Sequence, residues 1–236
     1  MNWRDVPMPD AIAALPREAR GFPVPAFVYR PDDWQPGQPL DLRMLDTDAA
    51  LILMMARRCG VCGLPVGYRM WFIGGPMCLY NRIFETPTHR ECAEYAMLAC
   101  PHLNNSQHEY VTRPGDELLG HGDPNLIKTR PRYQVLVSTR GYKVLTRDET
   151  GRRLAKPLAK IDPWTECEWR SNDGTPTADT YAVLDVPTSR GFQQALYCFD
   201  CISTGHPAIS LNPVDIAQRY CGSCHRFLAD EVHAGV

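Results

Sequence analysis

The strongest constraint on the fold comes from two pairs of cysteines near the C-terminus, Cys198 with Cys201 and Cys221 with Cys224. Together they form the pattern C-x2-C-x19-C-x2-C, a spacing that is typical of a four-cysteine zinc site. Each C-x2-C pair is expected to form a tight turn, and two such turns can close a tetrahedron of sulfur atoms around one Zn²⁺ ion. The sequence therefore predicts a C-terminal zinc ribbon.

The residues around these cysteines support that interpretation. Gly222 follows the first cysteine of the second pair, where we expect it to supply a sharp backbone turn. Asn212 and Pro213 are typical of a helix start and predict a short helix that ends near Tyr220. A redox dithiol is the alternative, but it typically uses a single C-x2-C pair next to a βαβ pattern. We interpret His206 and His225 as non-ligating neighbours.

A second metal site is predicted in the first half of the chain. Cys59 and Cys62 form another C-x2-C pair, and His89 and Cys92 complete the pattern C-x2-C-x26-H-x2-C. Thr88 and Glu91 match a capping box, which predicts that a helix begins at Thr88. His89 and Cys92 then lie on one face of its first turn and can bind the same metal ion. A turn followed by a helix start is the treble-clef arrangement, with strands and a loop expected over residues 69–86.

Three other cysteines compete for a place in this site or in the core. Cys78 and Cys100 are the rival ligands, and Cys100 is followed closely by His102. The spacing alone leaves open whether Cys100 or His102 replaces one of the four ligands. We interpret Cys78, Cys100 and Cys167 as buried small side chains, the usual state of a free cysteine.

The compartment follows from the distribution of apolar residues and cysteines. The N-terminal residues show no export signal, and the longest apolar run, residues 49–56, is about half the length of a membrane-spanning helix. We therefore expect a cytoplasmic protein that does not enter a membrane. In a reducing compartment, clustered cysteines among the 10 in the chain indicate metal ligands, here for two structural zinc ions.

The rest of the chain is expected to form short strands and one further helix. Residues 26–30 and 41–45 are predicted to be strands, and Asp46 is predicted to cap a helix that runs to about Arg58. Residues 103–127 are expected to form a long connection. Residues 165–174 and 180–187 have the composition of strands.

A basic stretch stands out against the net charge of −2. Residues 128–160 contain ten Lys or Arg residues and two acids. They are predicted to form an antiparallel meander, in which strands 133–138 and 142–147 are joined by a hairpin loop and a second turn follows at 148–151. A basic sheet face can bind nucleic acid or an acidic protein, whereas the plain alternative is a solvated surface. The candidate nucleic-acid-binding residues are Arg130, Arg132, Arg140, Lys143, Arg147, Arg152, Arg153 and Lys156.

The expected fold class is α+β, built from small zinc-stabilised modules. Residues 1–127 are predicted to hold an N-terminal lead-in and the treble-clef-like unit. Residues 128–187 are predicted to form the basic antiparallel meander, and residues 188–236 the four-cysteine zinc ribbon.

Several segments also resemble known sequences of unassigned activity. The order RGFPVPAF, RRCGVCGLPVG, IGGPMCLYNRI, PTHRECAEYAMLACPHL and STRGY, over roughly residues 20–145, resembles uncharacterised bacterial and phage zinc-binding proteins. The tail, CFDCISTGHP followed by NPVDIAQRYCGSCHRFL, is similar to a zinc ribbon of uncharacterised actinobacterial and phage proteins. The resemblance implies the same eight metal ligands and a relation to phages or prophages, with the host cytoplasm as the location.

The function predicted from these features is that of a non-catalytic zinc-binding protein that acts as a nucleic-acid- or protein-binding module. Eight ligands in two closed sites leave no metal position open for water. The alternatives are a phage structural or assembly component and a metal-dependent nuclease of the His-Asn-His type. The residues available to such a nuclease are His102, Asn104, Asn105, His108, His121 and Asn125.

Overall fold

The computed structural model of this chain describes residues 3–101, 103–104, 132–148, 150–161, 163–188, 191–206 and 208–228. Within them the fold is α+β with antiparallel sheets, as the sequence predicts. The helices are η1 (Trp3–Asp5), α1 (Asp10–Ala13), α2 (Thr47–Met55), α3 (Pro76–Asn81), α4 (Arg90–Ala99), α5 (Phe199–Ser203) and α6 (Pro213–Gln218). The strands are β1 (Met70–Gly74), β2 (Ile83–Phe84), β3 (Tyr133–Thr139), β4 (Lys143–Arg147), β5 (Arg153–Lys160), β6 (Glu166–Ser171), β7 (Tyr181–Thr188), β8 (Gly191–Cys198), β9 (Ile209–Ser210), β10 (Tyr220–Cys221) and β11 (Arg226–Phe227).

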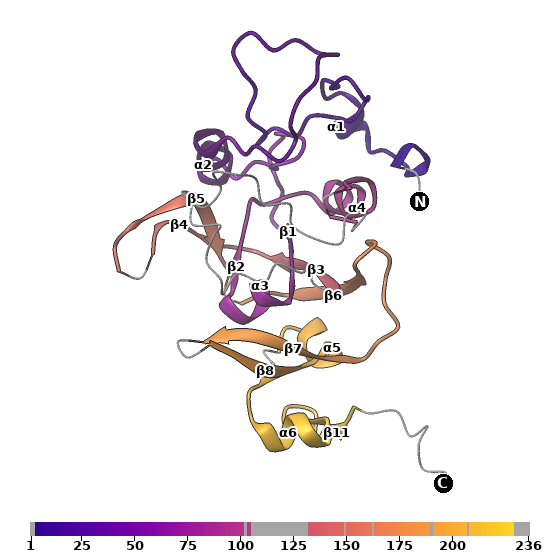
Figure 1. Cartoon of the computed structure of the whole chain (residues 1–236), viewed down its shortest axis with the longest axis vertical. Helices are drawn as coiled ribbons and strands as arrows, with labels where there is room; N and C mark the ends of the chain where they lie inside the picture. The colour runs from indigo at the N-terminus through magenta and orange to yellow at the C-terminus, as the bar shows by residue number, and fades with distance from the viewer. Residues whose placement is uncertain are drawn as a thin grey trace.

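A three-stranded sheet in the order β1-β3-β6 lies in the middle of the molecule (Figure 1). All seven residues of β3 are buried, because each face of the strand is covered by a different part of the chain. Tyr133, Val135 and Val137 share one face and belong to the main core with residues of β7, β8 and α5. Leu136 lies on the other face, in a small cluster with Met97 of α4. Side chains that alternate along β3 thus pack against the C-terminal region on one face and against α4 on the other.

The predicted hairpin between residues 133–138 and 142–147 is wrong. β3 pairs with β1 and β6, whereas β4 pairs with β5 in a separate sheet of order β2-β5-β4. The physical reason is that β3 is buried on both faces and takes a central position with a neighbouring strand on each side. The second predicted turn is confirmed, because Asp148 accepts from the backbone N–H of Thr150 and Gly151 has a φ of 85°.

The C-terminal part contains a sheet of order β7-β8-β9 and the short hairpin β10–β11. β7 and β8 pair along their whole length and lie in one sheet. The predicted boundary between modules, after residue 187, therefore falls inside β7. Residues 165–174 and 180–187 do form strands, but β6 pairs with β3 and not with β7. The buried side chains of this region belong to the same core as the central sheets.

Three local predictions in the N-terminal half need correction. Residues 26–30 and 41–45 form a single bridge, Val28 with Leu45, because turns interrupt both segments before a ladder can extend. The cap at Asp46 is confirmed, because its carboxylate accepts from the N–H of Ala49 at 2.8 Å, but α2 ends at Met55 and not near Arg58. Residues 69–86 were expected to form strands and a loop, but they also contain α3.

The helix that was predicted to begin at Thr88 begins two residues later. The Thr88 hydroxyl donates to the carbonyl of Trp71, and the two residues form a β-bridge. Thr88 is therefore held against β1 and does not cap the helix, so His89 occupies the N-cap of α4.

Among the residues that the structure describes, no helix combines the length and the apolar character needed to cross a membrane.

Candidate metal centres

The first cluster consists of Cys59, Cys62, His89 and Cys92, whose ligand atoms all lie within 4.8 Å of one another. The Nδ1 atom of His89 is 3.3 Å from the sulfur of Cys62 and 3.8 Å from that of Cys92. Donors bound tetrahedrally to one zinc ion lie about 3.5–3.8 Å apart. The four residues predicted from the spacing are therefore positioned to hold a zinc ion.

Two local structures place these donors. In the turn after α2, the N–H of Cys62 points to the sulfur of Cys59, and the N–H of Gly63 donates to the Cys59 carbonyl at 2.8 Å. Gly63 has a φ of 74°, a conformation that glycine adopts without strain. At the other side of the cluster, His89 is the N-cap of α4 and Cys92 is in the first turn. We call the turn of residues 59–63 the first knuckle.

The imidazole of His89 is fixed by a partner that the sequence did not reveal. Its Nε2 atom lies 2.9 Å from the carbonyl oxygen of Pro65, which can only accept a hydrogen bond. Nε2 therefore carries the proton, and the lone pair of Nδ1 faces the thiols. A carbonyl that orients a histidine in this way is common behind zinc ligands.

The three thiols of the first cluster differ in acidity. Burial raises the pKa of Cys62, and the hydrogen bond with Cys59 together with burial raises that of Cys92, whereas the pKa of Cys59 is lowered. Cys59, Cys62 and Cys92 are buried among Val6, Ile12 and other apolar residues in a small core of their own. A hydrogen bond with the Cys92 thiol lowers the pKa of Cys59 to about 5, against the opposing effect of burial. A thiolate is the form of cysteine that binds zinc.

The second cluster consists of Cys198, Cys201, Cys221 and Cys224, again with all four sulfur atoms within 4.8 Å. The sulfur of Cys198 is 4.0 Å from that of Cys224, and the sulfur of Cys201 is 3.9 Å from that of Cys221. These separations are close to the value of about 3.8 Å expected around one zinc ion. The chain thus has a CCHC set and a CCCC set positioned to hold two zinc ions.

The construction of the second cluster differs from the two tight turns that were predicted. Cys198 ends β8 and is the N-cap of α5, and Cys201 lies in the first turn of that helix. Only the other pair forms a knuckle, in which the N–H of His225 donates to the Cys221 carbonyl at 2.8 Å. We call the turn of residues 221–225 the second knuckle.

Gly222 does not have the role that was expected of it. The left-handed residue of the second knuckle is His225, with a φ of 55°, and it corresponds to Gly63 in the first knuckle. A Cβ atom at Gly222 would have no neighbour within 4 Å, so the position tolerates a side chain. The turn is closed by the residue after the second cysteine in both knuckles.

Arg226 links the two halves of the second cluster. Its Nε atom donates to the sulfur of Cys224 at 3.4 Å, and its Nη2 atom donates to the carboxylate of Asp200 at 2.7 Å. Burial raises the pKa of Cys224, but Arg226 and the neighbouring thiols lower it to about 7. Arg226 was not among the residues predicted from the sequence, although a cation two positions after a ligating cysteine is a usable signal.

The other histidines and cysteines that the structure describes lie outside both clusters. His225 is exposed, and its Nδ1 atom is 3.0 Å from the hydroxyl of Tyr220. His206 is also exposed. Cys167 is buried in the main core, and Cys78 and Cys100 are partly buried. Cys92, not Cys100, completes the first cluster, while His102 lies outside the described residues.

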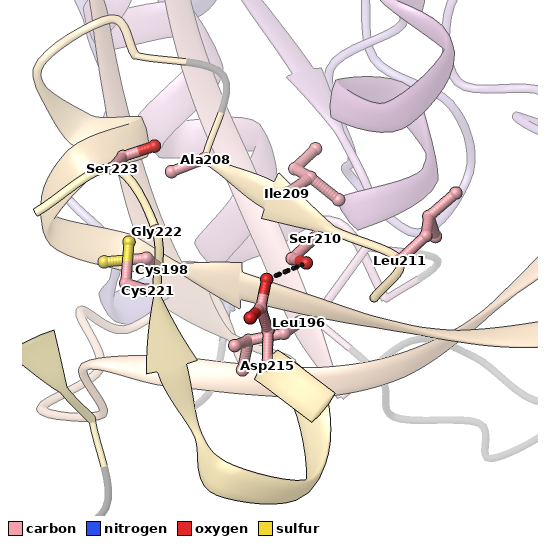
Figure 2. Close-up of a pocket in the computed structure, with 10 residues that line it drawn as sticks. All are labelled: Leu196, Cys198, Ala208, Ile209, Ser210, Leu211, Asp215, Cys221, Gly222 and Ser223. Carbon is pink, nitrogen blue, oxygen red and sulfur yellow. Dashed lines mark hydrogen bonds between the residues drawn. The ribbon is translucent and has the colours of Figure 1, made fainter. Parts of the chain in front are cut away.

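A hollow of about 270 Å³ lies beside the second cluster (Figure 2). Cys198, Cys221 and Ser223 line one side, and β9 and α6 line the other. The carboxylate of Asp215 points into this region but already accepts a hydrogen bond from Ser210 at 2.8 Å (Figure 2). The residues that line the hollow include this Ser210–Asp215 pair but no histidine or lysine.

The eight candidate nucleic-acid-binding residues do not form one surface. Five of them lie on the hairpin β4–β5, namely Lys143, Arg147, Arg152, Arg153 and Lys156. Arg140 precedes this hairpin and lies over the ring of Tyr68. Arg132 is at the opposite end of β3, 3.6 Å from Asp179, and Arg130 is outside the described residues.

Comparison with known proteins adds no assignment. No family model, curated protein sequence or solved structure matches this chain. The two clusters and the surfaces around them therefore carry the functional argument.

Proposed function

We propose that this zinc-binding protein is non-catalytic and that its hairpin β4–β5 binds the phosphate backbone of nucleic acid. The turn end of the hairpin projects to the left in Figure 1, whereas the other end of β5 pairs with β2. Both metal clusters are complete four-donor sets, which is typical of structural zinc. In this proposal the zinc ions stabilise the scaffold, and the hairpin makes the contacts.

The observation that carries the proposal is the pairing of like charges across the hairpin. Lys143 lies directly opposite Lys160, and Arg147 lies directly opposite Arg153. Like charges in such positions destabilise a sheet. All four side chains belong to exposed residues, and none forms an ion pair with a carboxylate in the described part of the chain. A polyanion would relieve the repulsion by binding between them.

Lys156 differs from the other cations of the hairpin. It forms an ion pair with Glu85, which neutralises part of its charge. Lys156 is therefore a weaker candidate for a phosphate contact than the exposed residues Arg152 and Arg153.

The compartment and the origin belong to the same proposal. All ten cysteines are thiols, and eight of them form the two clusters. Thiols in this arrangement suit a reducing cytoplasm. We keep the relation to phage-encoded proteins, and with it a structural or assembly role, as a proposal supported by the sequence resemblance alone.

The nuclease alternative receives no support from the described residues. Among its six candidates only Asn104 is described, and its amide donates to the carbonyl of Leu98 at the end of α4. The other five lie outside the described residues.

The experiment is a binding titration of fluorescent single-stranded and duplex DNA over a series of salt concentrations. We expect the logarithm of the affinity to fall linearly with the logarithm of salt, by about 0.7–0.9 for each phosphate contact. Replacing Arg152 and Arg153 by Glu should lower both the affinity and this slope, with two zinc ions retained. Arg30→Glu changes the charge of an exposed residue outside the hairpin and serves as the control. Equal binding by all three proteins would refute the proposal.

A further inference from the structure

α2 is an apolar helix that is only half buried. Its residues 49–55 are all apolar, yet only Ala50, Leu53 and Met54 are buried. On the opposite side of the helix, Ile52 and Met55 lie three residues apart and are 66% and 69% exposed. A helix that is apolar all round is normally covered on all sides. This face of α2 is therefore left uncovered by the described residues.

This face continues onto the loop of the first knuckle. Arg57 and Arg58 follow α2, and the Arg58 side chain donates to the carbonyl of Gly63 at 2.9 Å. The loop exposes two further apolar side chains, Leu64 at 50% and Tyr68 at 72%. Backbone bonds hold the loop against the end of α2, including the N–H of Val66 with the carbonyl of Arg57.

The knuckle end of the same surface is cationic, whereas exposed Asp48 lies at the other end of the α2 face. Arg57 donates to the carbonyl of Arg140 at 3.3 Å, and the guanidinium of Arg140 lies over the ring of Tyr68 at 5.2 Å. In the described part of the chain, Arg57, Arg58 and Arg140 form no ion pair with a carboxylate. We define the α2–knuckle surface by Ile52, Met55, Arg57, Leu64, Tyr68 and Arg140.

We propose that the α2–knuckle surface docks an acidic segment of a partner protein that carries apolar anchor side chains. Met, Tyr and Arg are enriched in protein–protein interfaces, and Tyr and Arg are frequent among the residues that dominate binding. The exposed apolar side chains match apolar anchors, and the guanidinium groups match carboxylates around them. This proposal does not depend on nucleic-acid binding by the hairpin β4–β5.

Charge, apolar character and helix length argue against three other occupants: a second copy of the chain, nucleic acid and a membrane. A twofold dimer through this surface would bring the arginines of both copies together, which is unfavourable. Nucleic acid would match the arginines but would leave Ile52, Met55 and Leu64 facing phosphates. A membrane surface would meet a helix of only nine residues.

The zinc ion of the first cluster has a part in this proposal. Leu64 and Tyr68 lie on the segment that follows the first knuckle, and Cys59 and Cys62 lie between that segment and α2. The backbone bond from the N–H of Cys59 to the carbonyl of Leu64 closes the loop. Metal removal should therefore disorder the docking surface.

The test is selection of a displayed library of random peptides against the full-length, zinc-loaded protein. We expect enrichment of peptides that combine Asp or Glu with Leu, Ile or Phe. A synthetic copy of an enriched peptide should bind Met55→Glu at least about tenfold more weakly, since buried anchors dominate such interfaces. Arg140→Gln should also weaken binding and reduce its salt dependence.

Matched controls separate this result from misfolding and from the hairpin. Val214→Glu makes the same chemical change on α6, where Val214 is 57% exposed, and should leave peptide binding unchanged. The double variant Arg152→Glu, Arg153→Glu should also leave it unchanged. Both zinc ions should remain in every variant.

Four outcomes would overturn the proposal. The first is the absence of enriched peptides, and the second is equal binding of the peptides to Met55→Glu and the wild-type protein. Self-association that Met55→Glu abolishes would assign the surface to a second copy of the chain. Binding of anionic vesicles or DNA that depends on Met55 would assign it to a lipid or a nucleic acid.

Discussion

The two zinc clusters have the same local construction in opposite chain order. In each, one donor is the N-cap of a helix and another lies three residues later, in pairs His89 with Cys92 and Cys198 with Cys201. The other two donors come from a knuckle, which precedes the helix in the first cluster and follows it in the second. The same arrangement of four donors can thus form whether the knuckle comes before or after the helix in the chain.

The clusters differ in charge and in the core that surrounds them. Zinc bound to three thiolates and one imidazole has a net charge of −1, whereas zinc bound to four thiolates has −2. The second cluster has Arg226 beside it, and the first has a neutral carbonyl behind His89. The first cluster lies in a small core of its own, but Cys198, Cys201 and Cys221 belong to the main core. Loss of the first zinc ion should therefore destabilise a small region, whereas loss of the second should destabilise the main core.

The largest expected effect compares Cys221→Ser with Cys62→Ser. Each variant should lose one of two zinc ions, as measured by native mass spectrometry. Structural zinc contributes on the order of 10 kcal/mol in small modules, so hydrogen exchange should rise strongly near the lost metal. For Cys221→Ser the increase should extend to β3 and β6, because they share the main core.

For Cys62→Ser we expect faster exchange in α1 and α4, which surround the first cluster. If Cys221→Ser affected residues 191–228 alone, the shared core would not couple the ribbon to the central sheet. A metal count of one or zero in the wild-type protein would contradict the two-site description itself.

A smaller effect is expected when alanine replaces the glycine that follows the first cysteine of each knuckle, Gly60 or Gly222. A Cβ at Gly60 would lie 2.1 Å from the Thr86 hydroxyl oxygen, whereas a Cβ at Gly222 meets nothing within 4 Å. Gly60→Ala should cost about 1–3 kcal/mol of unfolding free energy through overpacking. Gly222→Ala should stay within about 0.5 kcal/mol of the wild type. Urea unfolding of the zinc-loaded proteins measures both, and equal costs would contradict the difference between the knuckles.

The smallest expected effect concerns the charge beside the second cluster. Arg226→Gln should lower the zinc affinity of that cluster by about 10–100-fold, as changes behind metal ligands do. Without Arg226 the pKa of Cys224 should rise from about 7. Protons would then compete with zinc up to a higher pH, and zinc release on acidification should begin earlier.

A chelator competition over a range of pH values measures this shift. His225→Ala is the control and should change neither zinc content nor its pH dependence, since His225 faces Tyr220. A shift of the first cluster in Arg226→Gln would show that the two sites are not independent.

The sequence by itself determined the eight candidate metal ligands, the caps at Asp46 and Asn212 and the turn after Asp148. These features depend on contacts between residues a few positions apart, which a spacing or a cap residue encodes directly. The tertiary structure alone decided the partners of β3, because burial on both faces becomes visible only when α4 and the C-terminal sheet are in place. It also placed Thr88 against Trp71, moved the start of α4 and brought Arg140 to Arg57, since contacts between segments far apart in the chain depend on the packing of the whole molecule.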